Sequence, residues 1–133
     1  MAAVFAASTA LRQTHVALAW LVVVTNGLAG TWALAADRFP GLRRRELWWL
    51  TGFAQITVFV QVVIGVVLRS REMAGRNMDH LQFHMLYGFT AAFTVAIIYS
   101  YRAQLKPHLY RLYGFGGLWL MGLALRAIFI NPV

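Results

Sequence analysis

The sequence predicts an all-α membrane protein: a bundle of four transmembrane helices that run up and down and are joined by short loops. Of its 133 residues, 60% are hydrophobic and only 12% charged, and the mean hydropathy is +0.62; soluble domains are about 45–50% apolar and about 25% charged. Four apolar stretches are each long enough to cross the roughly 30 Å hydrocarbon core of a bilayer. The loops between them are too short for a soluble domain, so we expect one membrane domain over residues 1–133.

We expect the helices over residues 15–36, 47–68, 80–101 and 109–130. Ser8 or Thr9 is expected to cap the first helix, because a hydroxyl at the cap position accepts a hydrogen bond from an exposed backbone N–H. Pro40 and Pro107 fall in the first and third loops, where a missing backbone donor does no harm. Asp79, followed three residues later by a glutamine, gives a capping-box-like start to the third helix.

The basic residues are divided unevenly between the two sides of the predicted bundle. The loops over residues 37–46 and 102–109, with the start of the fourth helix, carry seven: Arg38, Arg43, Arg44, Arg45, Arg102, Lys106 and Arg111. The opposite side carries four, or five with Arg126. Because cytoplasmic loops are enriched in basic residues, we expect these two loops in the cytoplasm and both termini outside a bacterial plasma membrane. The net charge of +8 then reflects topology, and no nucleic-acid partner is expected.

Aromatic residues gather next to the same two loops and predict a belt at the cytoplasmic interface, where amphipathic rings are enriched. They are Trp48, Trp49, Tyr99, Tyr101, Tyr110 and Tyr113.

Ionisable residues inside the apolar stretches are the candidate functional residues, because such groups are costly in hydrocarbon. In the predicted topology His15, His84 and Arg126 lie near the outward ends of their helices, at similar depth. Two neutral imidazoles that face each other across a four-helix bundle suit b-type haem, and an arginine at that level suits a propionate. The candidate haem b site is therefore His15 and His84 as axial ligands with Arg126 at a propionate, and His80 is the second choice of ligand.

Other roles are open for several of these polar positions. A metal site is one alternative, since His80 and His84 are four residues apart on one helix face. The neutral polar residues Asn26, Gln55 and Gln61 are interpreted as interhelical hydrogen-bonding groups. Gly88 follows His84 by one helical turn and leaves room for another helix or a flat cofactor.

The runs TGFAQITVFVQVVIGVVL and DHLQFHMLYGF resemble part of one four-helix half of the haem A synthase family and, more loosely, b-type cytochrome membrane domains. The resemblance covers residues 51–92. It implies that Gln61 and Gly65 neighbour an outward-side histidine, His84, that ligates haem. The family also carries a glutamate a few residues before one ligand histidine, whereas nothing acidic precedes His15. The resemblance favours haem binding and does not imply haem A synthesis, since this chain has half the family's length.

Three function classes follow from these patterns. The first is a non-catalytic accessory subunit of a larger membrane complex, such as a respiratory one, with lipid and other membrane subunits or a second copy as partners. The second is an electron carrier with haem b ligated by His15 and His84. The third is a metal-binding protein or small-molecule carrier. No carboxylate lies in the middle of a predicted helix, which disfavours a proton-driven pump, and the sequence holds no nucleophile pattern that indicates an enzyme.

Overall fold

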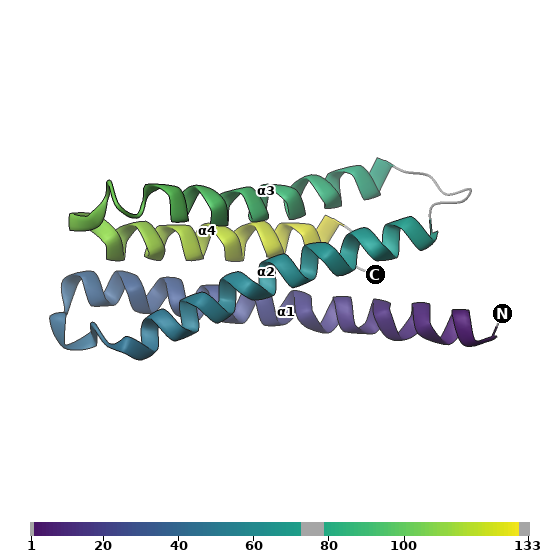
Figure 1. The fold of residues 1–133 in the computed structure, drawn as a ribbon, viewed down its shortest axis with the longest axis horizontal. Helices are drawn as coiled ribbons and strands as arrows, with labels where there is room; N and C mark the ends of the chain where they lie inside the picture. Colours follow the sequence, from purple (N-terminus) through teal and green to yellow (C-terminus); the bar gives the residue numbers. More distant parts are fainter. Residues whose placement is uncertain (1, 73–78, 131–133) are drawn as a thin grey trace.

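The computed structural model describes residues 2–72 and 79–130, which form four α-helices and two short 3₁₀ helices. In chain order these are α1 (Ala2–Arg38), η1 (Pro40–Leu42), α2 (Arg45–Glu72), α3 (Asp79–Tyr101), η2 (Lys106–His108) and α4 (Leu109–Ile130). The predicted all-α class is confirmed. Successive helices run in opposite directions, so that η1 and η2 lie at one end of the molecule and the start of α1 and the end of α4 lie toward the other (Figure 1). We call these the turn end and the terminal end.

The ends of α2, α3 and α4 lie within a few residues of their predicted positions, but the predicted start of the first helix was wrong. The helix begins at Ala2, and Ser8 and Thr9 lie inside it. The residues before Ser8 are mostly alanine, the strongest helix former, so nothing stops the helix at the expected cap. As a result α1 has 37 residues and extends past the end of α4 (Figure 1).

Within residues 2–72 and 79–130, three segments are long and apolar enough to span a membrane: Thr9–Arg38, Arg45–Ser70 and Lys106–Ile130. Within α3, the segment Met85–Tyr101 is a shorter apolar stretch. Large apolar side chains are exposed on all four helices, for example Trp20, Phe53, Phe93 and Phe129, as expected for surfaces that face lipid. The chain is a membrane protein.

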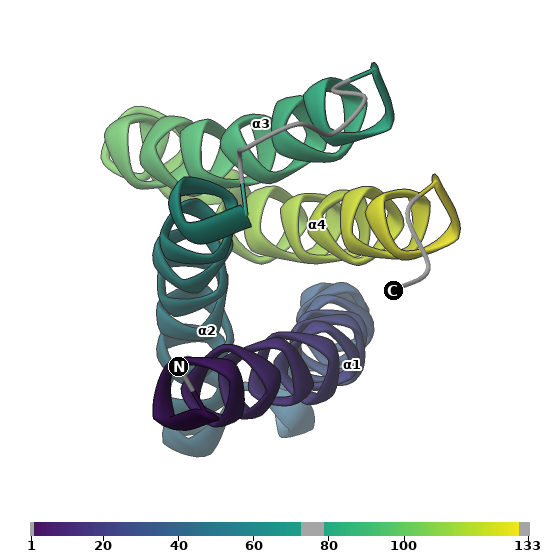
Figure 2. The same cartoon turned by 90° about the vertical axis from the view of Figure 1, so that its right-hand side faces the viewer.

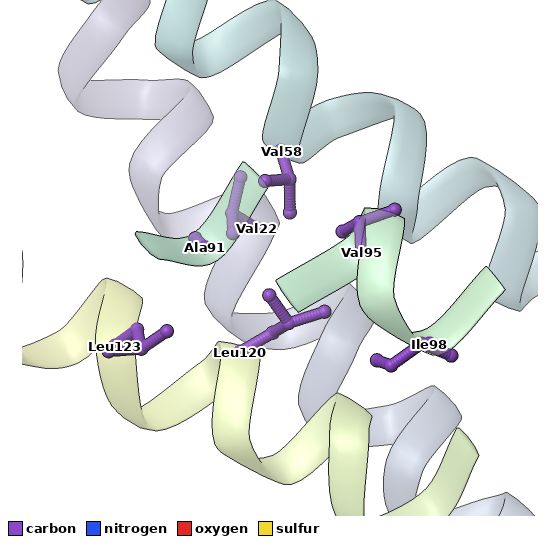
Figure 3. Packing of buried hydrophobic residues seen from close by; sticks show 7 residues of the cluster. All are labelled: Val22, Val58, Ala91, Val95, Ile98, Leu120 and Leu123. Carbon is purple, nitrogen blue, oxygen red and sulfur yellow. The ribbon is translucent and has the colours of Figure 1, made fainter. Parts of the chain in front are cut away.

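Viewed along the bundle, α2 lies at one side and connects α1 with the α3–α4 pair (Figure 2). The central core draws on all four helices, and its side chains point toward a common centre (Figure 3). Its buried members are Val22, Val58, Ala91, Val95, Ile98, Leu120 and Leu123. A second, smaller core of Ala33, Ala36 and Leu47 joins α1 to α2 near the turn end.

The first and last helices pack with their backbones in contact. A Cβ atom placed on Gly117 of α4 would lie 2.8 Å from Gly30 Cα and 2.9 Å from the Asn26 carbonyl oxygen of α1. A Cβ on Gly114 would lie 3.0 Å from the backbone nitrogen of Leu34. Close approach through small residues is a main means of helix association in membranes, where lipid removes the hydrophobic driving force.

The turn end is held by arginine contacts. Arg43 donates from Nε to the Ala36 carbonyl at 2.8 Å and from Nη2 to the Asp37 carbonyl at 2.9 Å, and so satisfies carbonyls at the C-terminus of α1 that lack helical partners. Its guanidinium also lies 4.9 Å from the ring centroid of Tyr110. Arg111 of α4 forms an ion pair with Asp37, with Nε 2.9 Å from Oδ2. These contacts join α1, α4 and the first loop.

The six residues predicted as an aromatic belt all lie near the turn end. Trp48 packs against Tyr110 and Tyr113, with ring centroids 5.4 and 5.2 Å away. Trp49 and Tyr99 point outward and are 73% and 62% exposed. Trp48, Tyr110 and Tyr113 therefore pack α2 against α4. Trp49, Tyr99 and Tyr101 are exposed and are available to a membrane–water interface.

Candidate functional site

His15 lies on α1 with its side chain half-buried against α2. A Cβ atom placed on Gly65 would come within 3.2 Å of His15 Cε1, so the absence of a side chain at Gly65 gives the imidazole its space. The Gln61 amide crosses between the two helices and donates from Nε2 to the His15 backbone carbonyl at 2.8 Å. The position of His15 is thus fixed by two α2 residues that are one helical turn apart.

Arg69 continues the same line along α2. Gln61, Gly65 and Arg69 are spaced by four residues, which puts them on one face of the helix. Among the residues that the structure describes, Gln61 Oε1 and Arg69 Nε are buried and make no hydrogen bond. A buried polar atom left in this state costs about 1–3 kcal/mol. We call His15, Gln61, Gly65 and Arg69 the polar cluster.

The third helix approaches α2 beside this cluster. Arg69 donates from Nη1 to the Met85 sulfur, and a Cβ on Gly88 would lie 3.9 Å from Val62 Cγ2. His84 immediately precedes Met85 in α3, so its backbone passes the same part of α2. The side chains of His80 and His84 lie outside the described residues, and both the haem and the metal roles assigned to them stay predictions.

Arg126 is exposed on α4 and is not level with His15. A Cβ on Gly27 would lie 2.7 Å from the Met121 sulfur, and Asp37 pairs with Arg111. This antiparallel register sets Arg126 opposite Val22, a distance of about 10 Å along α1 from His15 at 1.5 Å per residue. The equal depth expected from sequence assumed helix ends that lie level, whereas α1 extends well past α4 (Figure 1).

Arg69 lies one helical turn beyond Gly65 on α2, whereas the predicted second helix ended at residue 68 and left Arg69 in the following loop. The four-residue spacing of Gln61, Gly65 and Arg69 is the sequence signal that places Arg69 on the same face of α2 as the other two. Arg69 requires α2 to continue beyond residue 68, and the helix does so, ending at Glu72.

The remaining polar positions lie deeper in the bundle. Asn26 is buried, and its Nδ2 donates to the Val22 carbonyl at 2.9 Å within α1 and to the Ala54 carbonyl of α2 at 3.3 Å. It therefore links two helices through a hydrogen bond. Gln55 is half-buried on α2. Among the described residues, no three His, Cys, Asp or Glu side chains are grouped so as to hold a metal ion.

No family model matches the chain, and neither the search of curated proteins nor the search of solved structures found a similar protein.

Proposed function

We propose that this chain is a b-type haem protein of the bacterial plasma membrane that carries electrons within or to a larger membrane complex. In this proposal all four helices span the bilayer, both termini face outward and the turn end is cytoplasmic. The 23 residues of α3 correspond to about 35 Å at 1.5 Å per residue, enough to cross a hydrocarbon core of roughly 30 Å.

The observation that carries the proposal is the buried Nε of Arg69 in the polar cluster. Gln61 Oε1 and Arg69 Nε are buried and have no hydrogen-bond partner among the described residues, and only the second of them is a donor. An arginine in such a position suits a carboxylate, because its planar guanidinium can form two parallel hydrogen bonds. A ligand with a carboxylate would therefore relieve the desolvation cost of Arg69.

The residues of the polar cluster fit a haem in distinct ways. His15 would supply an imidazole ligand, and Arg69 would supply a cation for a propionate. Gly65 has no side chain and so leaves space on α2 for the His15 imidazole. Gln61 holds α1 in register through the His15 carbonyl. His84 is proposed as the second ligand, because α3 brings its backbone to the level of Arg69. A bound haem would supply one-electron redox chemistry.

The test is a reduced-minus-oxidised visible spectrum of the protein purified from haem-replete cells. We expect a b-type band that is lost in His15→Ala and in His84→Ala. Arg69→Gln is expected to lower the haem content by at least half, while Arg126→Gln, which removes the same charge from α4, leaves it unchanged. A flat spectrum with no iron in the preparation, or a band that survives His15→Ala, would refute haem binding at this site.

A second candidate is a non-catalytic accessory subunit, and the outer face of α4 favours it. Trp119, Gly122 and Arg126 lie on one side of the helix, and all three are exposed. A Cβ on Gly122 would have no atom within 4 Å, and a charged residue within a span is costly unless it meets a partner or water. A helix of another subunit that carries an acidic group fits this face.

Purification in mild detergent distinguishes the two candidates. An accessory subunit would copurify with other membrane proteins, and Gly122→Leu combined with Arg126→Gln would release them without changing the visible spectrum. A preparation that contains only this chain, coloured by haem, would count against the accessory role.

A further inference from the structure

A groove runs between α3 and α4 at the turn end, whereas the polar cluster lies toward the terminal end. Its volume is about 410 Å³, within the range of about 300–1,000 Å³ typical of ligand sites. The sides are apolar and are formed by Ile98, Leu112, Phe115 and Trp119. At the deep end Trp119 donates from Nε1 to Thr94 Oγ1 at 3.2 Å, which joins the two helices below the groove.

The lining of the groove is almost entirely apolar. At the turn end it includes His108 and Arg111, which contribute mainly their nonpolar atoms to it. Arg111 is 59% exposed and uses Nε for Asp37, so four of the five N–H donors of its guanidinium are available to an acceptor. The same end of the molecule carries seven exposed arginine and lysine side chains: Arg38, Arg43, Arg44, Arg45, Arg102, Lys106 and Arg111.

The length of the groove matches one leaflet of a bilayer. Arg111 and Trp119 are eight residues apart on α4, or about 12 Å at 1.5 Å per residue. One leaflet contributes about half of the roughly 30 Å hydrocarbon core. With Arg111 at the headgroup level, the apolar part of the groove therefore spans most of the depth that one acyl chain occupies.

We propose that this groove binds one anionic phospholipid of the leaflet at the turn end, with an acyl chain between α3 and α4 and the phosphate at Arg111. Juxtamembrane basic residues attract anionic lipid headgroups, and basic pockets between transmembrane helices bind them specifically. An apolar groove with the exposed guanidinium of Arg111 beside it at headgroup depth matches both parts of such a lipid. This site is independent of the haem proposal.

The test is native mass spectrometry of the purified full chain in detergent, titrated with dioleoyl phosphatidylglycerol or dioleoyl phosphatidylcholine. We expect the anionic lipid to bind at least fivefold more tightly. Arg111→Gln is expected to weaken phosphatidylglycerol binding about fivefold, the effect of one basic residue near a membrane surface. Leu105→Trp enlarges a partly exposed residue of the groove and is expected to weaken both lipids.

Two variants serve as matched controls. Asp37→Asn breaks the same ion pair as Arg111→Gln but keeps the cation, and should bind phosphatidylglycerol at least as well as the wild type. Arg102→Gln removes the same charge at the same end, from a residue whose guanidinium lies 4.8 Å from the Tyr99 ring centroid and outside the groove, and should change binding less than twofold. Equal affinity for the two lipids, an Arg102→Gln loss as large as that of Arg111→Gln, or full binding by Leu105→Trp would overturn the proposal.

Discussion

Gly30 and Gly117 bring the backbones of α1 and α4 into direct contact. A Cβ atom on Gly117 would lie 2.8 Å from Gly30 Cα, and a Cβ on Gly30 would lie 2.8 Å from both the Gly114 carbonyl oxygen and the Leu118 nitrogen. These neighbours are main-chain atoms, so a side chain cannot be accommodated by a rotamer change. The contact ties the first helix in the sequence to the last and sets the register that separates Arg126 from His15.

Replacing Gly117 with leucine should separate the two helices. We expect a loss of about 2–3 kcal/mol of stability, the upper part of the range for overpacked cores, seen as a lower thermal unfolding midpoint by circular dichroism in detergent. Gly122→Leu is the matched control on the same helix, because a Cβ there would have nothing within 4 Å. Equal midpoints for the two variants would show that α1 and α4 are not in backbone contact.

Replacing Asn26 with alanine should weaken the α1–α2 pair. The variant loses the hydrogen bond from Nδ2 to the Ala54 carbonyl and leaves a small void at a residue that is 2% exposed. Interhelical hydrogen bonds in membranes contribute about 0.6 kcal/mol and up to about 1.7, so we expect a loss of about 1–2 kcal/mol with the void included. Gln55→Ala, at a half-buried position on α2, should change the unfolding midpoint by much less; the opposite order would contradict this assignment.

Replacing Arg43 with lysine should loosen the C-terminus of α1 although the charge is kept. Lysine lacks the planar fork that donates to the Ala36 and Asp37 carbonyls together, and it stacks less well on Tyr110. We expect about 1–2 kcal/mol of destabilisation and faster hydrogen exchange in the last turn of α1. The neighbouring Arg44→Lys serves as a control, since its ion pair with Glu46 is 3.7 Å long and 66% exposed on both sides. Unchanged hydrogen exchange in the last turn of α1 in Arg43→Lys would show that Arg43 does not cap this helix.

Replacing Asp37 with asparagine should have only a small effect on folding. The Asp37–Arg111 pair is short at 2.9 Å, but the side chains are 25% and 59% exposed, and pairs in contact with solvent contribute about 0–1 kcal/mol. A double-mutant cycle with Arg111→Gln measures the coupling, which should shrink further in high salt because solvent ions screen it. A coupling above about 2 kcal/mol would mean that the pair is shielded from water.

The helices were largely predictable because their apolar stretches and flanking prolines are local features of the sequence. Pro40 and Pro107 mark the turns, and the structure has them in η1 and η2. The start of α1 was missed because Ser8 and Thr9 are common cap residues, while the alanines before them extend the helix. Helix pairing could not be read from the sequence, since several helices carry glycines and the choice of Gly30 with Gly117 depends on three-dimensional fit.

The candidate site was predictable in part. His15 and Gln61 were identified as polar residues within apolar helices, but their contact depends on the α1–α2 register, which spacing along one helix does not determine. Arg69 was missed because its position in the sequence suggests a loop, and its burial results from the extra turn of α2 and the approach of Met85. Arg126 was placed by counting from helix ends, and that method fails when one helix is much longer than its neighbours.

The pairing of α1 with α4 has a consequence for biosynthesis. Translation proceeds from the N-terminus, so α1 and α2 emerge from the ribosome and enter the membrane well before α4 has been made. During that interval the surface of α1 around Gly27, Gly30 and Leu34, which packs on α4 in the complete bundle, is exposed to lipid or to any other nascent segment nearby. The bundle is complete only after α4 has been inserted. A product truncated before Leu109 would lack α4, and this helix-packing surface of α1 would stay uncovered.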